Sequence, residues 1–343
     1  MKKNKKTIGI IGFGQFGTLV AAILSKHAKV SVYNRSINNE IEERAQKIGV
    51  KLVDLKTAAQ CDIVILTVAI SVTEKVIKEI SRLLKPGTLV LDTCSVKVEP
   101  VKWLKKNLPA NVDILATHPM FGPITTKFNV EKKYFELENK QIVLCPVRIS
   151  LEKLNSIKKF LKNLKLEVIE TTPADHDQQN AKTLSFVHFL GRALMRAGIG
   201  EQKIFTPGYA DLLKISPHTN SDKWQLFCDM HEYNHYSEKV RNRFFLACDS
   251  LEEDLLHAIY KDDIEFNRHK IDSIDRRIVE LLTQRLKCAE SIGAAKKQQG
   301  LPINDQKREE AIISRLSSQS GLNPDFIEKI YKIIFKESKK RQK

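Results

Sequence analysis

The sequence predicts a doubly wound α/β domain at the N-terminus, followed by regions that are entirely helical. From residue 8 to about residue 147, apolar runs of strand length alternate with helix-like segments, as in a sheet covered by helices on both faces. From about residue 262 onward the apolar spacing is helical only. The expected strands cover residues 8–11, 30–33, 51–55, 63–68, 89–92, 112–116 and 142–144. These runs are continuously apolar, so we expect a parallel sheet.

The first expected strand leads into a glycine-rich turn. Gly12, Gly14 and Gly17 have the spacing G-x-G-x-x-G between an apolar strand and an apolar helix. Such glycines permit a tight turn, close approach to a pyrophosphate and close packing of helix on strand. The turn therefore predicts a dinucleotide site in a Rossmann-like domain. The residues expected to form it are Gly12, Phe13, Gly14, Gln15, Phe16, Gly17 and Val68.

The end of the second expected strand indicates which dinucleotide binds. An NAD site usually has Asp or Glu there to hold the ribose 2′-hydroxyl, whereas this chain has Asn34, Arg35 and Ser36. Without the carboxylate, a ribose 2′-phosphate is not repelled at this position, and the arginine and the serine hydroxyl can donate hydrogen bonds to it. We therefore expect NADP as the cofactor, with NAD as the alternative. Arg35 is otherwise a surface loop residue.

Polar residues follow two later strands. Ser95 lies in the stretch Asp92-Thr-Cys-Ser-Val-Lys97, and His118 opens His-Pro-Met-Phe-Gly-Pro. In an open parallel sheet the carboxyl ends of the strands border the ligand crevice. Ser95 and His118 are therefore expected to face the nicotinamide end. A histidine before a proline is otherwise structural, but two polar strand ends beside a cofactor site favour chemistry.

The composition narrows the classes of protein to which the chain could belong. The 343 residues allow two or three domains, and no apolar run approaches the ~20 residues that span a bilayer. The six cysteines are scattered without a paired motif, so we expect a cytoplasmic chain without a metal site or disulfides. The net charge of +16 is interpreted as solvated helix faces and attraction of small anionic substrates. No nucleic-acid motif accompanies it.

The C-terminal region predicts one long helix and two shorter ones. Helical spacing persists from Ile264 to about Gln298, on the order of 50 Å, so the helix needs a partner chain to cover it. Arg285 interrupts the apolar side, and Lys296 lies within about 20° of it on the helical wheel. Two cations on an apolar seam are costly unless an anion lies between them. A charged dimerisation bundle is the alternative.

The N-terminal part resembles the prephenate/arogenate dehydrogenase family of tyrosine biosynthesis. The resemblance rests on the glycine turn and the stretches 92–97 and 118–123, and it extends to about residue 257 through 175–177, 186–191 and 224–234. It implies an all-helical second domain that closes the active site and makes the dimer. It also implies that His118 is the base for the substrate hydroxyl and that Ser95 hydrogen-bonds that hydroxyl or the histidine.

The same resemblance leaves the binding of the substrate carboxylate open. His188 matches a family histidine that faces the substrate, with a core or capping role as the alternative. Lys214 stands where many bacterial members have an arginine, and a lysine lacks the bidentate fork. Either another arginine (Arg192, Arg241 or Arg243) substitutes for it, or arogenate is the preferred substrate.

The C-terminal region resembles the all-helical chorismate mutase family. The matching positions are Arg268, Arg285, Lys296, Asp305, Arg308, Glu309, Ser338 and Gln342. The resemblance implies that Arg285 and Arg268 of the partner subunit hold the substrate carboxylates. Lys296 and Gln342 would then donate to the ether oxygen, and Glu309 would hold the ring hydroxyl. Asp305, Arg308 and Ser338 would complete the pocket.

Together these resemblances predict a bifunctional, homodimeric enzyme that makes prephenate from chorismate and oxidises it with NADP. The expected domains are 1–148 for the cofactor, 149–257 for substrate and dimerisation, and 261–343 for the mutase. Neither nucleic acid nor a membrane is an expected partner. The alternatives are an arogenate dehydrogenase with a mutase domain, or a dehydrogenase whose helical tail only dimerises or senses a ligand.

Overall fold

The computed structural model describes residues 6–129, 134–215, 219 and 222–342. The chain divides into two compact units, Met1–Phe245 and Leu246–Lys343. The division falls inside α12 (Ser237–Ile259), before the boundary expected near residues 257–261. No helix in the described part of the chain is both long and apolar enough to cross a membrane.

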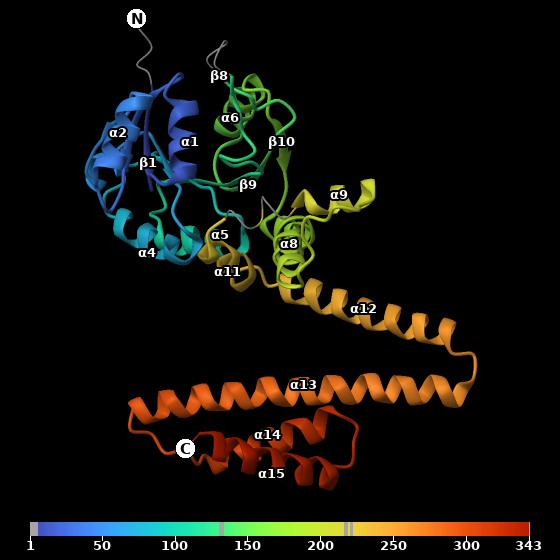
Figure 1. The fold of residues 1–343 in the computed structure, drawn as a ribbon. Helices are drawn as coiled ribbons and strands as arrows, with labels where there is room; N and C mark the ends of the chain where they lie inside the picture. Colours follow the sequence, from blue (N-terminus) through green and yellow to red (C-terminus); the bar gives the residue numbers. More distant parts are fainter. Residues whose placement is uncertain (1–5, 130–133, 216–218, 220–221, 343) are drawn as a thin grey trace, which may run out of the picture. The chain divides into compact units, whose positions relative to one another are not determined.

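The first unit is built on one eight-stranded sheet with the order β10-β9-β6-β5-β4-β1-β2-β3 (Figure 1). Its strands are β1 (Thr7–Ile11), β2 (Lys29–Tyr33), β3 (Lys51–Leu52), β4 (Ile63–Leu66), β5 (Leu89–Asp92), β6 (Asp113–Pro119), β9 (Gln141–Arg148) and β10 (Glu167–Glu170). The predicted doubly wound class is confirmed. The sheet continues past residue 148, where the sequence placed the end of this domain, because β10 pairs with β9.

The expected parallel sheet has one antiparallel pairing near its edge, between β6 and β9. β9 runs antiparallel to β6, and β10 follows β9, while the other strands are parallel to one another. A parallel return needs a crossover of a dozen or more residues, usually a helix. The connection between β6 and β9 instead carries the two-stranded pair β7 (Phe128–Asn129) and β8 (Tyr134–Phe135).

Helices cover both faces of the sheet. Buried residues of α3 (Leu55–Ala59), α4 (Ile70–Ile80) and α5 (Val98–Asn107) share one apolar cluster with β1, β4 and β5. Residues of α1 (Gln15–Leu24), α2 (Asn39–Ile48) and α6 (Leu151–Asn163) pack in two others. The carboxyl ends of the central strands are thereby left to carry polar residues.

A helical region follows the sheet in the same unit. It comprises α7 (Pro173–Asn180), a π-type segment η1 (Ala181–Ser185), α8 (Phe186–Arg196), α9 (Pro207–Leu213), α11 (Trp224–Glu232) and the start of α12. The hydroxyl of Thr172 caps α7 and that of Thr206 caps α9, each followed by a proline, as helix starts favour. Residues of α7 and α8 contribute to the site described below.

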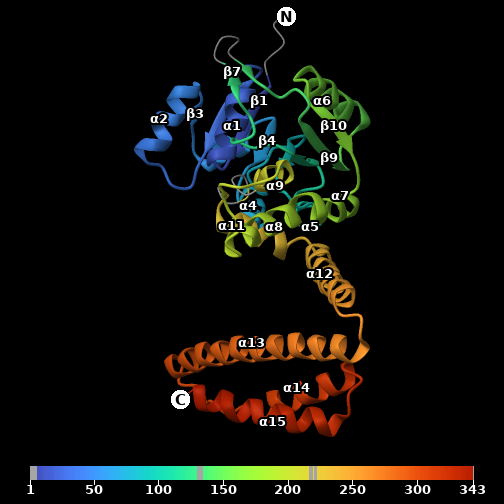
Figure 2. The same ribbon diagram turned by 45° about the vertical axis from the view of Figure 1, so that its right-hand side comes forward.

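The second unit contains the end of α12 with α13 (Asp263–Gln298), α14 (Gln306–Gln319) and α15 (Pro324–Arg341). The helix predicted over 264–298 is confirmed as α13, and α14 and α15 lie along it in both views (Figure 1 and Figure 2). Seven large apolar residues of α13 are exposed in the single chain: Ile264, Ile271, Ile274, Ile278, Val279, Leu281 and Ile292. Much of the predicted apolar seam is therefore uncovered within one chain.

Candidate active sites

The glycine turn has the geometry that its spacing predicts. Gly12 has φ +105°, a conformation that L side chains rarely adopt. A Cβ on Gly17 would lie 2.0 Å from the carbonyl oxygen of Gly12, so α1 packs directly against the turn. A Cβ on Gly14 would meet no protein atom within 4 Å. Open space at the N-terminus of α1 therefore suits a phosphate group.

Asn34 holds this turn in place. Its side-chain oxygen accepts a hydrogen bond from the Phe13 N–H at 3.0 Å, and its amide donates to the Ser36 carbonyl at 2.6 Å. Arg35 and Ser36 are exposed at the end of β2. Arg44 of α2, which the sequence did not single out, donates to the Phe13 carbonyl at 3.3 Å. The turn is thus flanked by two arginines.

A buried ion pair lies beneath the strand ends. Lys97 and Asp92 have fully buried side chains and form a salt bridge, and the ammonium also donates to the Thr117 carbonyl at 2.6 Å. Asp177 of α7 accepts hydrogen bonds from the backbone N–H groups of Lys97 and Val98 at 2.6 and 2.9 Å. These contacts fix the loop that carries Ser95 between β6 and the helical region.

His118 is buried at the carboxyl end of β6, 6% exposed. Burial, with His176 and Lys97 nearby, holds the pKa of His118 well below its usual value. Its Nδ1 lies 2.9 Å from Nε2 of His176. Ser95 presents a buried hydroxyl that has no hydrogen-bond partner among the described residues. A neutral imidazole and an unused hydroxyl on adjacent strand ends suit proton transfer from a ligand.

The helical region supplies further polar groups. Asn180 donates to the Ser95 carbonyl at 2.5 Å, while its side-chain oxygen is buried without a partner in the described part of the chain. Nδ1 of the buried His188 and Nε of Arg192 are likewise unpartnered. Arg192 also donates to the Asp222 carbonyl at 2.8 Å. Lys214 instead forms an ion pair with Asp211 and is 74% exposed.

In the second unit, residues far apart in sequence converge between α13 and α15. Arg285 donates to the Ser338 hydroxyl at 2.5 Å. A Cβ on Gly293 would lie 2.7 Å from Cα of Gln342, whose side-chain oxygen is buried and unpartnered within the described chain. Lys296 donates to the carbonyls of Pro302 and Ile303 at 2.9 and 3.0 Å.

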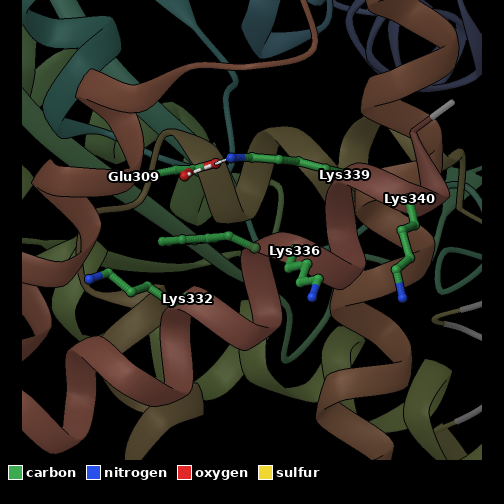
Figure 3. Close-up of a pocket in the computed structure, with 6 residues that line it drawn as sticks. Glu309, Lys332, Lys336, Lys339 and Lys340 are labelled. Atoms are coloured by element: carbon green, nitrogen blue, oxygen red, sulfur yellow. Dashed lines mark hydrogen bonds and ion pairs between the residues drawn. The ribbon is translucent and has the colours of Figure 1, made fainter.

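Glu309 of α14 faces α15 across a pocket (Figure 3). It forms an ion pair with Lys339 at 2.9 Å, a contact that the sequence did not predict. The other charged residues of this pocket are Lys332, Lys336 and Lys340. Asp305 caps α14 by accepting from the Arg308 N–H at 3.1 Å. Arg308 and Arg268 are exposed.

Three family models match the chain. Residues 20–170 match the prephenate dehydrogenase nucleotide-binding domain, and residues 193–265 match a TYRAAT1-like C-terminal domain. Residues 267–343 match chorismate mutase type II. The chain joins a prephenate dehydrogenase domain to a type II chorismate mutase domain. The polar strand ends therefore lie in the region that matches the prephenate dehydrogenase model, and the convergent residues of α13–α15 lie in the region that matches the chorismate mutase model.

Individual relatives agree with this division. The chain is 31% identical over 262 residues to arogenate dehydrogenase 1 of Arabidopsis thaliana. The aligned region covers 75% of this chain and 40% of the relative. It is 33% identical over 86 residues to a bifunctional chorismate mutase/prephenate dehydratase of Buchnera aphidicola subsp. Schizaphis graminum, covering 24% and 22%. The chain thus spans less than half the length of either relative.

A solved structure supports the fold of the dehydrogenase part. Prephenate dehydrogenase from A. aeolicus, in complex with hydroxyphenyl propionate and NAD+, superposes with a TM-score of 0.60. It is 19% identical and covers 81% of this chain and 99% of that chain.

The sequence analysis gave no site role to several groups near Ser95 and His118, although three of them lie in the stretches 92–97 and 175–177 that carry the resemblance. Lys97, His176, Asp177 and Asn180 are buried or half-buried around Ser95 and His118. For the three residues of α7, the available signal was the cluster of polar residues at 175–180, which precedes an apolar helix and has no surface-helix periodicity.

Proposed function

We propose that the chain is a bifunctional enzyme that rearranges chorismate to prephenate and oxidatively decarboxylates prephenate to 4-hydroxyphenylpyruvate. The observation that carries the dehydrogenase half is the buried His118 beside the unpartnered Ser95 hydroxyl. Prephenate carries a hydroxyl and a hydrogen on one ring carbon and a carboxylate on the opposite carbon. Removal of the hydroxyl proton, loss of hydride and loss of CO₂ together make the ring aromatic.

The chain's own residues provide the proton chemistry. A bound nicotinamide supplies the hydride acceptor. His118 takes the hydroxyl proton, because burial keeps its imidazole neutral near pH 7. Ser95 orients the hydroxyl or the imidazole, and His188 faces the substrate from α8. Arg192, half-buried with an unpartnered Nε, is a better candidate than the exposed Lys214 for the substrate carboxylate.

For the cofactor we propose NADP, with NAD as the alternative. Open space at Gly14 and the free N-terminus of α1 suit the pyrophosphate. Arg35, Ser36 and Arg44 offer donors near the end of β2. A higher kcat/KM with NAD than with NADP would contradict this assignment.

For the mutase we propose a homodimer. Its reaction needs a dianion held in a folded conformer and charge stabilised on the ether oxygen. Arg285, Lys296 and Gln342 supply the donors, and Glu309 holds the ring hydroxyl once it leaves Lys339. Arg268 lies 17 residues before Arg285 on one continuous helix, about 25 Å along its axis. It therefore belongs to the pocket of the partner subunit.

The decisive experiment gives the purified full-length chain chorismate and NADP. We expect NADPH and 4-hydroxyphenylpyruvate to appear together after a lag in which prephenate accumulates. The Arg285→Ala variant should lose this activity with chorismate and keep it with added prephenate. If the wild-type chain forms NADPH from neither chorismate nor prephenate, the proposal is rejected. If the Arg285→Ala variant is as active as the wild type with chorismate, the proposed mutase pocket is rejected.

Arogenate is the second candidate substrate of the dehydrogenase. The relative with 31% identity is an arogenate dehydrogenase, and Lys214 is exposed and paired with Asp211. The kcat/KM values for arogenate and prephenate, measured on one preparation, decide between them. We also propose the cytoplasm as the location, since all six cysteines are free thiols, as in reducing compartments.

A further inference from the structure

Three buried polar side chains, those of His118, His176 and Asp177, form a hydrogen-bonded line. Nδ1 of His118 lies 2.9 Å from Nε2 of His176, and Nδ1 of His176 lies 2.7 Å from Oδ1 of Asp177. These side chains belong to β6 and α7, and all three residues are at most 6% exposed. The proposed chemistry uses only the first of them.

Asp177, at the end of the line away from the substrate, determines which nitrogen of each histidine donates and which accepts a hydrogen bond. The Asp177 carboxylate accepts from the backbone N–H groups of Lys97 and Val98, so it is an acceptor toward His176 as well. His176 therefore carries its proton on Nδ1, and its Nε2 is an acceptor. His118 in turn carries its proton on Nδ1, which leaves the lone pair of Nε2 for a substrate.

We propose that His176 and Asp177 are positioning residues that hold His118 in the tautomer able to accept the substrate's hydroxyl proton. This inference rests on the proposed dehydrogenase function. In the proton transfer, the O–H bond of the substrate breaks and an N–H bond forms at Nε2 of His118. The imidazolium then keeps its Nδ1–H bond to His176, as a base oriented by a third group does.

The charges around the line support that step. The charged groups that act on the two imidazoles are Asp92 at the end of β5, Lys97 just before α5 and Asp177 of α7, and the same three groups act on Cys145 of β9. Burial raises the pKa of the Cys145 thiol to about 12, so it stays neutral. Lys97 lowers the pKa of both imidazoles, while Asp177 and Asp92 raise that of His176. The two carboxylates therefore strengthen His176 as the acceptor for the Nδ1–H of His118.

The test compares His176→Phe with a matched control, His235→Phe. His235 also pairs with a carboxylate, Glu99 at 2.9 Å, but on the surface. We expect His176→Phe to lower kcat roughly 10²-fold with KM almost unchanged. Without the acceptor at Nδ1, the His118 imidazolium is less stable, so the acid limb of the kcat profile moves to lower pH. The control should match the wild type.

A third variant separates positioning from packing. In His176→Gln the side-chain oxygen can accept from Nδ1 of His118, so part of the activity should return. Unchanged kcat in His176→Phe overturns the inference, and so does a loss of kcat without movement of the acid limb. If His118→Asn is also fully active, the proposed function fails as well. If His118→Asn is inactive while His176→Phe is normal, only this inference fails.

Discussion

Single side chains decide the chemistry proposed for the dehydrogenase site. We expect His118→Asn to lower kcat by ~10²–10⁴ and to leave KM close to unchanged, because an amide of similar size binds but takes no proton. Steady-state kinetics with prephenate and NADP measure both constants. His235→Asn on the surface of the same unit is the control. Near-normal turnover of His118→Asn removes His118 as the base.

The three glycines of the turn have separable roles. Gly14→Ala should change the free energy of unfolding by less than about 1 kcal/mol, because the added Cβ meets no protein atom. The same Cβ would occupy the space of the cofactor's phosphate, so the KM for NADP should rise. Gly17→Ala should cost about 1–3 kcal/mol, because its Cβ would lie 2.0 Å from the Gly12 carbonyl oxygen. Denaturant unfolding and cofactor titration measure the two effects. A stable Gly14→Ala protein with normal cofactor affinity contradicts the phosphate site.

Residue-level prediction succeeded where the backbone itself carried the signal. The roles of Gly12 and Gly17 follow from spacing alone, and the structure shows the positive φ and the close contact. Asn34 is different, since its side chain holds the turn. The contact of His118 with His176 joins residues 58 apart in sequence. A pairing of that kind depends on how α7 packs against the sheet, which no local pattern encodes.

At the scale of elements, α15 and the residue that caps its C-terminus, Gln342, provide two of the groups that complete the proposed mutase pocket. Deleting residues 338–343 removes Ser338, which accepts from Arg285, and Gln342, which packs against Gly293. We expect mutase activity to be abolished and dehydrogenase activity with prephenate to be retained. Deletion of Lys343 alone is the control, because it leaves both residues in place. Full mutase activity in the longer deletion refutes the assignment.

Helices and strands with a pattern sustained over many residues were predicted well, whereas short strands were not. α13 was predicted because apolar residues recur through 36 residues. β10 was missed because Glu167-Val-Ile-Glu170 has only two apolar residues at an exposed edge. The direction of β9 was wrong because an apolar run does not encode orientation, which the connection before it determines. The expected positions of Ser95 just after β5 and of His118 at the carboxyl end of β6 agree with the structure, since both strands belong to the parallel part of the sheet.

For the molecule as a whole, buried histidines link stability to pH. Burial lowers the pKa values of His118, His176 and His188, and that of His231 to about 4. The unfolded chain binds these protons near pH 6.5, while the folded unit does so only at lower pH. The free energy of unfolding should therefore fall as the pH is lowered from about 6.5 toward 4.

Tryptophan fluorescence measures this effect in the first unit, because Trp103 and Trp224 are the two tryptophans of the chain and both belong to it. Denaturant titrations at several pH values give the free energy of unfolding. The His231→Phe variant should lose less stability over the same range, because one proton fewer is taken up on unfolding. Stability that is constant or rises on acidification contradicts the prediction.

The length of α13 has a consequence for mixed assemblies. Since Arg268 and Arg285 lie too far apart on one helix to meet in one pocket, chains carrying Arg268→Ala and chains carrying Arg285→Ala should each be inactive as mutases. When the two variants are mixed in equal amounts and exchange subunits at random, half of the dimers contain one chain of each kind. In such a hybrid dimer one of the two pockets has both arginines and the other has neither. The mixture should therefore regain about a quarter of the native mutase rate. Two defective genes expressed together would then rescue one another.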